Sequence, residues 1–201
     1  MARAEPRVEV AAPPQRLARL VPDPQLDRFR PPASQLAALV DIAADPRGTV
    51  TALVADERLL GYAAFHPPSA IEAWGHDRTG ELIELGAVEV APALRGRGWA
   101  ERLLTESFAG GRFDPTVVFA TLYAWHYDLR RSGLTDVAYR RMLERLYRSA
   151  GLELYPTSDE DVRSSPANAL MARVGPQAPP EVVEEFHRLR RAAPGAPHVA
   201  W

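Results

Sequence analysis

The stretch "RGRG" at residues 95–98 places two glycines and two arginines directly before an apolar, helix-forming segment. Gly96 and Gly98 lack a Cβ, so the backbone N–H groups of this turn can face outward. The first turn of the following helix adds unpaired N–H groups and the positive end of the helix dipole. The turn therefore predicts an anion site that suits a pyrophosphate, with Arg95 and Arg97 adding positive charge. A tight strand-to-helix turn with solvated arginines is the alternative interpretation.

A second group of reactive side chains, "WHYD" at residues 125–128, ends a nearly continuous apolar stretch. His126 could relay a proton, and Asp128 could orient that histidine or bind an incoming ammonium group. The alternative is a polar strand end whose histidine bonds to a backbone carbonyl. The other histidines have no metal-like spacing, so we expect no metal site and assign solvated or loop positions to His66, His76, His187 and His198.

The elements that must position these groups follow from the spacing of apolar residues. The pattern predicts strands over residues 8–12, 49–55, 59–65, 81–91, 115–125, 152–156 and 168–174. It predicts helices over residues 35–44, 99–109, 135–150 and 179–193, with a proline-rich irregular segment at 13–32 and a long loop at 66–80. Ser34 is the expected N-cap of the first helix, and Gly151 the expected C-cap of the third. The fold class is α+β, with a mixed, mostly antiparallel central sheet flanked by helices.

Composition excludes several classes of protein. The 201 residues suit one domain, with an irregular N-terminal segment at 1–25 and a C-terminal helix and tail at 176–201. The absence of cysteine excludes disulfides, zinc–thiolate sites and a cysteine nucleophile. The absence of lysine excludes a Walker A phosphate loop.

Charge and hydropathy bear on partners and location. The net charge of −2 gives no bias toward nucleic acid or anionic membrane. The apolar runs are too short for a membrane span, and the first ten residues lack the apolar stretch of a secretory signal. We therefore expect a cytoplasmic protein that binds neither nucleic acid nor membrane. The sequence leaves the oligomeric state open.

The segment "VEVAPALRGRGWAERLL" resembles the acetyl-CoA-binding motif of the GNAT family of N-acetyltransferases. That motif, Arg/Gln-x-x-Gly-x-Gly/Ala, is matched by Arg95, Gly98 and Ala100. The resemblance implies one GNAT domain over residues 1–201, acetyl-CoA as the cosubstrate, a strand backbone that pairs with the pantetheine arm, and turn amides that hold the pyrophosphate. The cofactor-binding residues that it implies are Val88, Glu89, Val90, Arg95, Gly96, Arg97, Gly98, Trp99 and Ala100. Trp99 departs from the motif by its bulk.

Further segments resemble the same family. "LYRSAGLELY" is similar to its "LYxxxGF" motif: Tyr147 and Gly151 keep the spacing, and Leu152 replaces the usual aromatic residue. The blocks "FRPP", "WHYDL" and "SSPAN" resemble a narrower group, the acetoin-utilisation acetyltransferases. This likeness spans roughly residues 26–191. It implies that the substrate is a protein, AMP-forming acetyl-CoA synthetase, which acetylation of a lysine inactivates.

Acetyl transfer to lysine requires a neutral amine, and at pH 7 only about one lysine in 2,500 is neutral. A general base is worth about 10²- to 10⁴-fold in rate. Glu84 is the leading candidate base, because the resemblance places a catalytic glutamate on this strand; Glu81 and Glu89 are rivals. Glu89 has the opposite strand parity to Glu84 unless Gly86 forms a bulge. Tyr147 is the candidate acid toward the leaving sulfur.

Other functions remain open from the sequence. The same acetyl transfer could instead act on a small amine as the acceptor, which would require an enclosed acidic pocket. Alternatively, the chain could inhibit the synthetase by binding to it, with acetyl-CoA as the signal. A nucleic-acid role is disfavoured because the clustered arginines 95, 97 and 102 lie in a chain of slightly negative net charge.

Overall fold

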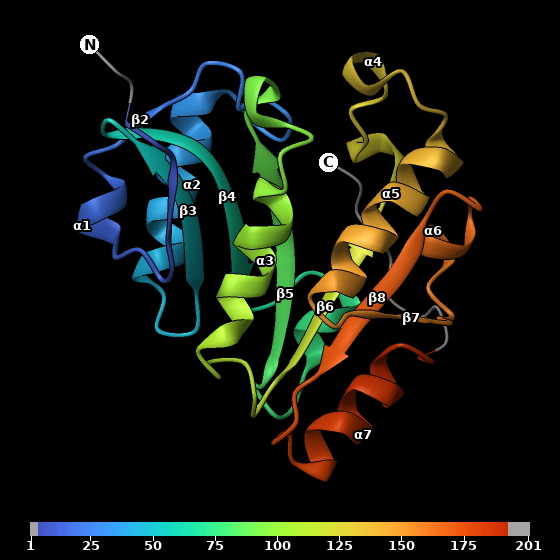
Figure 1. Cartoon of the computed structure of the whole chain (residues 1–201). Coiled ribbons are helices and arrows are strands. Elements are labelled where there is room, and N and C mark those ends of the chain that lie inside the picture. The colour runs from blue at the N-terminus through green and yellow to red at the C-terminus, as the bar shows by residue number, and fades with distance from the viewer. Residues whose placement is uncertain (1–3, 193–201) are drawn as a thin grey trace. The chain divides into compact units, whose positions relative to one another are not determined.

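The computed structural model describes residues 4–192, and these form two compact units (Figure 1). The first unit comprises the N-terminal part of the chain to His66 together with residues 85–112. The second comprises residues 67–84 and the chain from Phe113 onward. Strand β5 (Leu82–Val90) is shared, because its first three residues belong to the second unit and the rest to the first.

The first unit is built around a small, mostly antiparallel set of strands. Strand β3 pairs antiparallel with β1 on one side and with β4 on the other, and β2 adds a short parallel pairing to β4. Beyond the shared strand, its elements are β1 (Arg7–Glu9), α1 (Pro14–Leu17), β2 (Val21–Pro22), α2 (Pro32–Ala44), β3 (Thr49–Ala55), β4 (Arg58–His66), the 3₁₀ helix η2 (Pro92–Leu94) and α3 (Trp99–Ala109).

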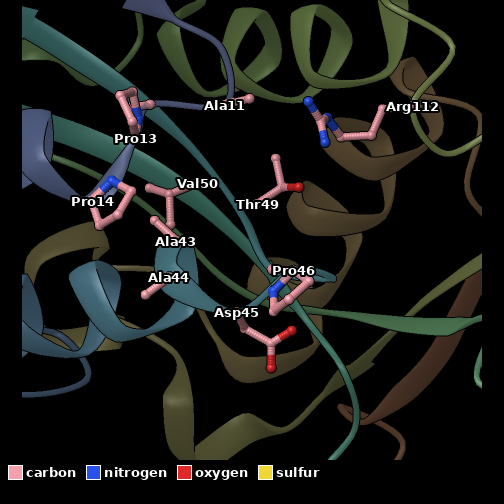
Figure 2. Close-up of a pocket in the computed structure, with 12 residues that line it drawn as sticks. Ala11, Pro13, Pro14, Ala43, Ala44, Asp45, Pro46, Thr49, Val50 and Arg112 are labelled. Atoms are coloured by element: carbon pink, nitrogen blue, oxygen red, sulfur yellow. The ribbon is translucent and has the colours of Figure 1, made fainter.

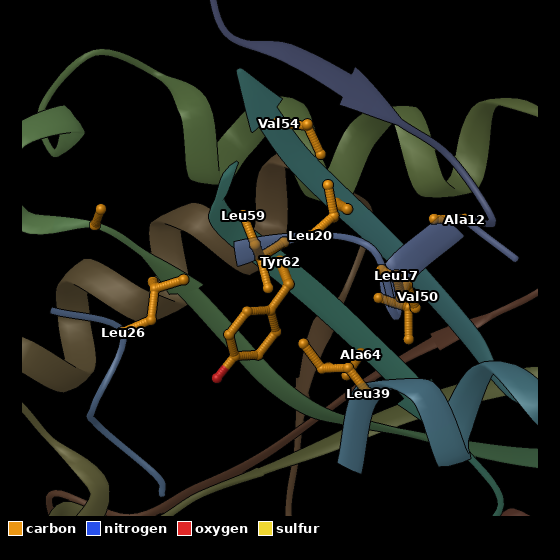
Figure 3. Close-up of a cluster of buried hydrophobic side chains, with 12 residues drawn as sticks. Ala12, Leu17, Leu20, Leu26, Leu39, Val50, Val54, Leu59, Tyr62 and Ala64 are labelled. Carbon is orange, nitrogen blue, oxygen red and sulfur yellow. The ribbon is translucent and has the colours of Figure 1, made fainter. Parts of the chain in front are cut away.

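Helices cover both faces of β3, which explains why every residue of this strand is buried. Val50, packed with Leu39 of α2, belongs to the apolar cluster on one face (Figure 3). On the other face, the hydroxyl of Ser107 in α3 lies 2.7 Å from that of Thr51. Strands covered on both faces lose the alternation of apolar and polar residues, so "TVTALVA" reads as a continuous apolar run.

The second unit repeats this organisation around β6 and β8. The first residues of β5 pair parallel with β6, and β8 pairs antiparallel with β6 and β7. Its further elements are η1 (Ala73–His76), β6 (Val117–Leu122), η3 (Ala124–His126), α4 (Leu129–Ser132), α5 (Asp136–Ser149), β7 (Glu153–Tyr155), α6 (Glu160–Arg163), β8 (Ala169–Val174) and α7 (Pro180–Leu189). The pairings in both units confirm the expected mixed, mostly antiparallel α+β fold.

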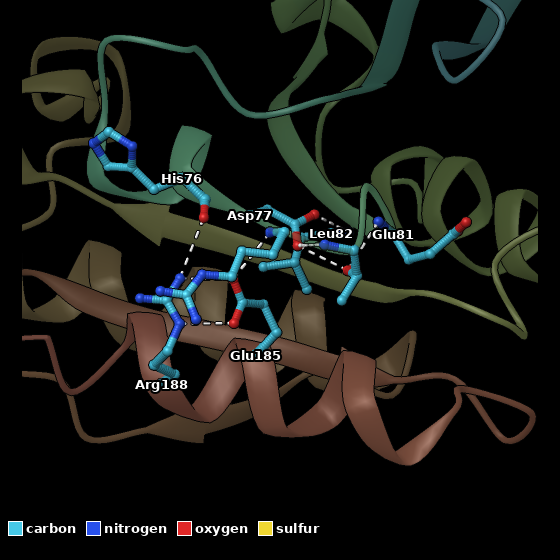
Figure 4. Close-up of polar contacts among 8 residues, drawn as sticks. His76, Asp77, Glu81, Leu82, Glu185 and Arg188 are labelled. Atoms are coloured by element: carbon cyan, nitrogen blue, oxygen red, sulfur yellow. Dashed lines mark hydrogen bonds and ion pairs between the residues drawn. The ribbon is translucent and has the colours of Figure 1, made fainter.

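The long loop after β4 is anchored to the core of the second unit. The ring of Trp74 in η1 stacks on Phe119 with centroids 4.3 Å apart, and on Phe186 of α7 at 5.8 Å. The carboxylate of Glu185 accepts a hydrogen bond of 2.9 Å from the backbone N–H of Arg78 (Figure 4). The guanidinium of Arg188 donates to the backbone carbonyl of His76 at 3.2 Å (Figure 4). These contacts give the loop a defined conformation ahead of β5.

Several element boundaries differ from the sequence-based expectation in the N-terminal part of the chain. The first strand is Arg7–Glu9 instead of 8–12, and the stretch expected to be irregular contains α1 and β2. The prediction that Ser34 caps α2 is wrong: the helix begins at Pro32, and Pro31 at the N-cap makes no side-chain hydrogen bond. A proline at the first helical position has a suitable fixed φ and no N–H to satisfy, so the helix starts there.

Differences in the second unit concern the segment after β6. The strand ends at Leu122, three residues before the predicted end, and short helices follow in place of extended chain. The backbone N–H of Ala124 donates to the side chain of Asn168 at 2.9 Å, so a side chain replaces a strand partner at this point. Helix α6 was not predicted. His198 and the end of the C-terminal tail lie outside the described residues.

No helix within residues 4–192 combines the length and the apolarity that a membrane crossing requires. The same residues contain no group of three or more histidine, aspartate or glutamate side chains arranged to hold a metal ion.

Candidate active site

The glycine-rich turn has the open backbone that its sequence predicts. Gly96 and Gly98 adopt left-handed conformations, with φ of 72° and 78°, which glycine tolerates far better than other residues. A Cβ placed on either glycine would meet no atom within 4 Å, so the space over this backbone is open. Gly98 is the N-cap of α3, and no side chain caps the helix. The positive end of α3 is therefore free of a capping side chain and fits an anionic diphosphate.

The two arginines of the turn have different environments. Arg95 Nε donates a hydrogen bond of 3.1 Å to the backbone carbonyl of Val90, which ties the turn to the end of β5. Arg97 is exposed. The guanidinium of Arg102 lies 4.8 Å from the ring centroid of Trp99, so the bulky aromatic of the turn packs with a cation of its own helix.

Glu89 is directed into the core of the first unit. Its carboxylate accepts hydrogen bonds from the hydroxyl of Tyr62 at 2.7 Å and from the backbone N–H of Arg28 at 3.0 Å. The side chain is buried, and this burial raises the pKa of Glu89. Desolvation, followed by the charge of Glu89, also raises the pKa of Tyr62 far above its usual range. A carboxylate so engaged is a poor candidate for deprotonating an acceptor, so the case for Glu89 as a rival base weakens.

Gly86 has a packing role. It has an ordinary φ and lies within strand β5. A Cβ on Gly86 would lie 2.2 Å from Nε2 of His66, which means that the imidazole occupies the place of a side chain.

Glu84 has the environment expected of a base that works near neutral pH. It is half-buried on β5, at the last of the three residue pairs with β6, opposite Phe119. Desolvation, reinforced by the nearby charge of Glu72, raises the pKa of Glu84 to about 7. A carboxyl with this pKa is about half ionised at pH 7 and can accept a proton from an amine. Glu81, by contrast, is exposed and precedes the strand.

Tyr147 lies in the last turn of α5 and is buried. Desolvation raises its pKa above the usual range, and the neighbouring Tyr127 and Tyr139 add to the shift. Those two rings stack on each other with centroids 4.7 Å apart. The phenol therefore stays protonated and can act as a hydrogen-bond donor. Gly151, with φ of 84°, follows the end of the helix and confirms the predicted cap.

His126 and Asp128 differ in their surroundings. His126 is exposed on η3, where its ring lies edge-on to Trp125 with centroids 5.9 Å apart. Asp128 is buried and lies 3.7 Å from the guanidinium of Arg131, so an arginine of its own helix neutralises it. Its predicted role in binding an ammonium group is therefore weakened. The exposed histidine keeps a surface position from which it can meet a substrate.

The "SSPAN" block is tied to the "WHYD" block, a connection that the sequence does not reveal. Asn168 is buried, and its Oδ1 accepts from the N–H of Ala124 while its Nδ2 donates to the carbonyl of Asp161 at 2.8 Å. The hydroxyl of Tyr127 donates to the carbonyl of Ala167 at 2.7 Å. The two blocks, about forty residues apart in the chain, thus form one structural element.

The two compact units divide the candidate residues between them. All the cofactor-binding candidates, Val88 to Ala100, belong to the first unit, and Glu84, His126 and Tyr147 belong to the second. The first unit also has an open pocket of about 290 Å³, lined mainly by alanine and proline side chains and by Asp45, Thr49 and Arg112 (Figure 2). None of the candidate residues lines this pocket.

The other histidines have structural surroundings. His66 fills the space beside Gly86, and His187 Nδ1 accepts a hydrogen bond of 2.8 Å from Nε of Arg190. Burial lowers the pKa of His187, and the charge of that arginine lowers it further. His76 is exposed in η1. These positions differ from the solvated or loop roles expected for His66 and His187.

Comparison with known proteins agrees with this fold. The sequence profile described as "Acetyltransferase (GNAT) family" matches residues 17–112. The crystal structure of an acetoin utilization protein from Exiguobacterium sibiricum 255-15 superposes with a TM-score of 0.88 and 35% identity, covering 93% of this chain and 95% of that one. The chain therefore belongs to the GNAT family and is an N-acetyltransferase.

Within this family the chain is similar to the acetoin utilization protein AcuA. The Bacillus licheniformis protein is 36% identical over 177 residues, 88% of this chain and 84% of that protein. The protein of Bacillus subtilis (strain 168) is 38% identical over 165 residues, 82% of this chain and 79% of that protein.

Proposed function

We propose that the chain is a cytoplasmic protein-lysine acetyltransferase that takes acetyl from acetyl-CoA and transfers it to AMP-forming acetyl-CoA synthetase, inactivating it. The observation that carries this proposal is the environment of Glu84, whose pKa of about 7 suits removal of a proton from an acceptor ammonium. Similarity to the AcuA proteins over most of the chain supports the choice of a protein acceptor.

The turn at residues 95–98 supports acetyl-CoA as the donor. Its two left-handed glycines leave the backbone open, and the N-terminus of α3 has no side-chain cap. The amides of residues 97–100 would hold the diphosphate, with Arg97 contributing charge from the surface. The carbonyl and N–H groups of residues 88–90 would pair with the pantetheine arm, and bound acetyl-CoA would supply the acetyl thioester.

Each catalytic role follows from the protonation state that its environment favours. Glu84 as carboxylate accepts the proton of the acceptor ammonium, so that the neutral nitrogen can form a bond to the acetyl carbon as the carbon–sulfur bond breaks. Tyr147, kept neutral by burial, donates a hydrogen bond to the departing thiolate, and the second proton of the attacking nitrogen is released to solvent as the amide forms. His126, exposed on η3, would contact the acceptor side of the reaction.

The test is incubation of the chain with acetyl-CoA and the synthetase, read by intact mass and by synthetase activity. We expect a gain of one acetyl group on the synthetase and a parallel loss of its activity. Glu84→Gln combined with Tyr147→Phe should abolish the mass gain, whereas Glu153→Gln, an exposed carboxylate of the same unit, should leave it intact. No mass gain with the wild-type chain, under conditions where calorimetry detects CoA binding, would remove the synthetase as acceptor.

The same double variant separates catalysis from inhibition by binding. If Glu84→Gln with Tyr147→Phe still inhibits the synthetase without acetylating it, the chain acts as a binding inhibitor. Turnover of free polyamines in place of the synthetase would indicate a small-amine acetyltransferase.

A further inference from the structure

Two aromatic side chains, the half-buried Tyr123 and the exposed Trp125, form a stack at the end of β6. The rings of Tyr123 and Trp125 are nearly parallel, with an interplanar angle of 10° and centroids 4.2 Å apart. The Trp125 side chain is 58% exposed, in contrast to the buried Trp74. An exposed tryptophan held in a fixed orientation is typical of a binding surface, because it offers a large contact area at low entropic cost.

Acidic side chains lie beside this stack. Asn168 connects the segment that carries the stack to the acidic helix α6. Its Oδ1 accepts a hydrogen bond from the N–H of Ala124 in η3, and its Nδ2 donates one to the backbone carbonyl of Asp161 in α6. Asp159 Oδ1 accepts from the backbone N–H groups of Asp161 and Val162 in α6, at 2.9 and 3.3 Å, which fixes its position. The segment 159–163, "DEDVR", has three acids and one base.

A further acid, Glu72, approaches the stack from the anchored loop. Desolvation and then the charges of Asp159, Asp161 and Glu72 raise the pKa of Tyr123. Glu72 also raises the pKa of Glu84, so the same carboxylate is near both the stack and the candidate base. The negative potential therefore extends from α6 past the aromatic pair to Glu84.

We propose that this surface, the Tyr123–Trp125 platform with Glu72, Asp159 and Asp161, docks the cationic segment of the protein substrate that carries the acceptor lysine. The inference rests on the proposed protein-lysine acetylation and names how the partner is recognised. Aromatic faces attract arginine and lysine cations, and carboxylates beside them strengthen that attraction. The exposed Trp125 and the flanking acids thus select a segment with positive residues next to the target lysine.

The platform also accounts for the anchored loop. The stacking of Trp74 on Phe119 and the bonds from Glu185 and Arg188 hold the loop that carries Glu72. A loop that is already ordered needs less further ordering when the partner binds, which favours affinity.

The test is binding of labelled lysine peptides, followed by fluorescence anisotropy, with the full chain. We expect a peptide with arginines beside the lysine to bind, and the same peptide with glutamates in those places to bind far more weakly. Raising the salt concentration to about 0.5 M should weaken binding of the arginine peptide. The variant Trp125→Ala/Asp161→Asn should bind the arginine peptide roughly tenfold more weakly than wild type. The control Val21→Ala/Glu153→Gln, an exposed apolar side chain and an exposed carboxylate elsewhere, should bind as wild type.

The outcomes separate this inference from the proposed function. If the platform variant binds the arginine peptide as tightly as wild type, or if neither peptide binds, the docking surface is wrong even where the synthetase is acetylated. If the arginine peptide binds through the platform but the synthetase gains no acetyl group, the surface stands and the choice of partner is wrong. With the synthetase as substrate, the platform variant should raise KM with little change in kcat, while the Kd for CoA stays unchanged.

Discussion

The hydroxyl of Tyr62 donates a hydrogen bond of 2.7 Å to the carboxylate of Glu89, and both side chains are buried in the first unit. The same carboxylate accepts from the N–H of Arg28, so one strand residue holds both a neighbouring strand and the chain that precedes α2. Glu89 follows Val88 and precedes Val90, whose carbonyl accepts from Arg95. The core of the unit is thereby connected to the strand end that leads into the glycine-rich turn.

Removing the hydroxyl from Tyr62 should destabilise the protein. Tyr62→Phe leaves a buried carboxylate with one donor fewer, which costs about 1–3 kcal/mol of unfolding free energy. Urea unfolding monitored by circular dichroism measures the change, with an unchanged m-value. In a double-mutant cycle with Glu89→Gln, the two substitutions should be coupled by about 0.5–3 kcal/mol. Additive effects would show that the bond contributes little.

Replacing Glu84 should make stability less dependent on pH. Its folded-state pKa, about 7, lies above the ordinary value of 4.5, so the folded protein retains a proton that the unfolded chain releases. Its contribution to stability is present below pH 4.5 and is lost as the pH rises toward 7. Glu84→Gln should therefore be more stable than wild type at pH 8 and similar to it at pH 4. A wild-type advantage at pH 8 would contradict the raised pKa.

Neutralising Glu72 should shift the pH dependence of activity. Because the charge of Glu72 raises the pKa of Glu84, Glu72→Gln lowers that pKa. The rate of the wild-type enzyme should fall as the pH decreases through about 7, when the base becomes protonated. In Glu72→Gln this decrease should occur at lower pH. Rates with acetyl-CoA at saturation, measured across the pH range, decide the question, and an unmoved profile would show that the charge of Glu72 does not set the pKa of the titrating base.

A Cβ at Gly98 should weaken CoA binding through backbone strain. Gly98 has φ of 78°, and other residues in this conformation cost roughly 1–2 kcal/mol. Gly98→Ala should thus raise the Kd for CoA by about five- to thirtyfold if the turn must leave its binding conformation to relieve the strain. Gly110→Ala is a matched control, because Gly110 has φ of −85° and equal free space at the C-cap of the same helix. Equal Kd values by calorimetry for both variants would rule out the left-handed turn as part of the site.

Local patterns in the sequence were sufficient to locate much of the fold and one half of the candidate site. The glycine-rich turn was predictable because a left-handed backbone and an uncapped helix start depend on residues adjacent in the chain. The same holds for Gly151, which ends α5 four residues after Tyr147 by the rules of helix termination. Short apolar runs bounded by turn residues placed β3, β4 and β8 for the same local reason.

Features that depend on contacts between residues far apart in the chain could not be predicted from local patterns. The strand after Thr116 ends at Leu122 because Asn168, far along the chain, takes the place of a strand partner. Gly86 leaves room for the imidazole of His66 on another strand, a packing reason for glycine that its place in the sequence does not show.

The choice of the candidate base between Glu84 and Glu89 shows the limit of local sequence patterns. In the sequence, the resemblance favours Glu84, and Glu89 differs from it in strand parity unless Gly86 forms a bulge. Strand parity does not show which face of β5 is exposed to solvent, because that depends on which elements pack over each face. Tyr62 and Arg28 bind Glu89 in the core, whereas Glu84 sits half-buried near Glu72 and acquires a pKa near neutrality. Desolvation and the charges of non-adjacent groups set ionisation, and these arise when the chain folds.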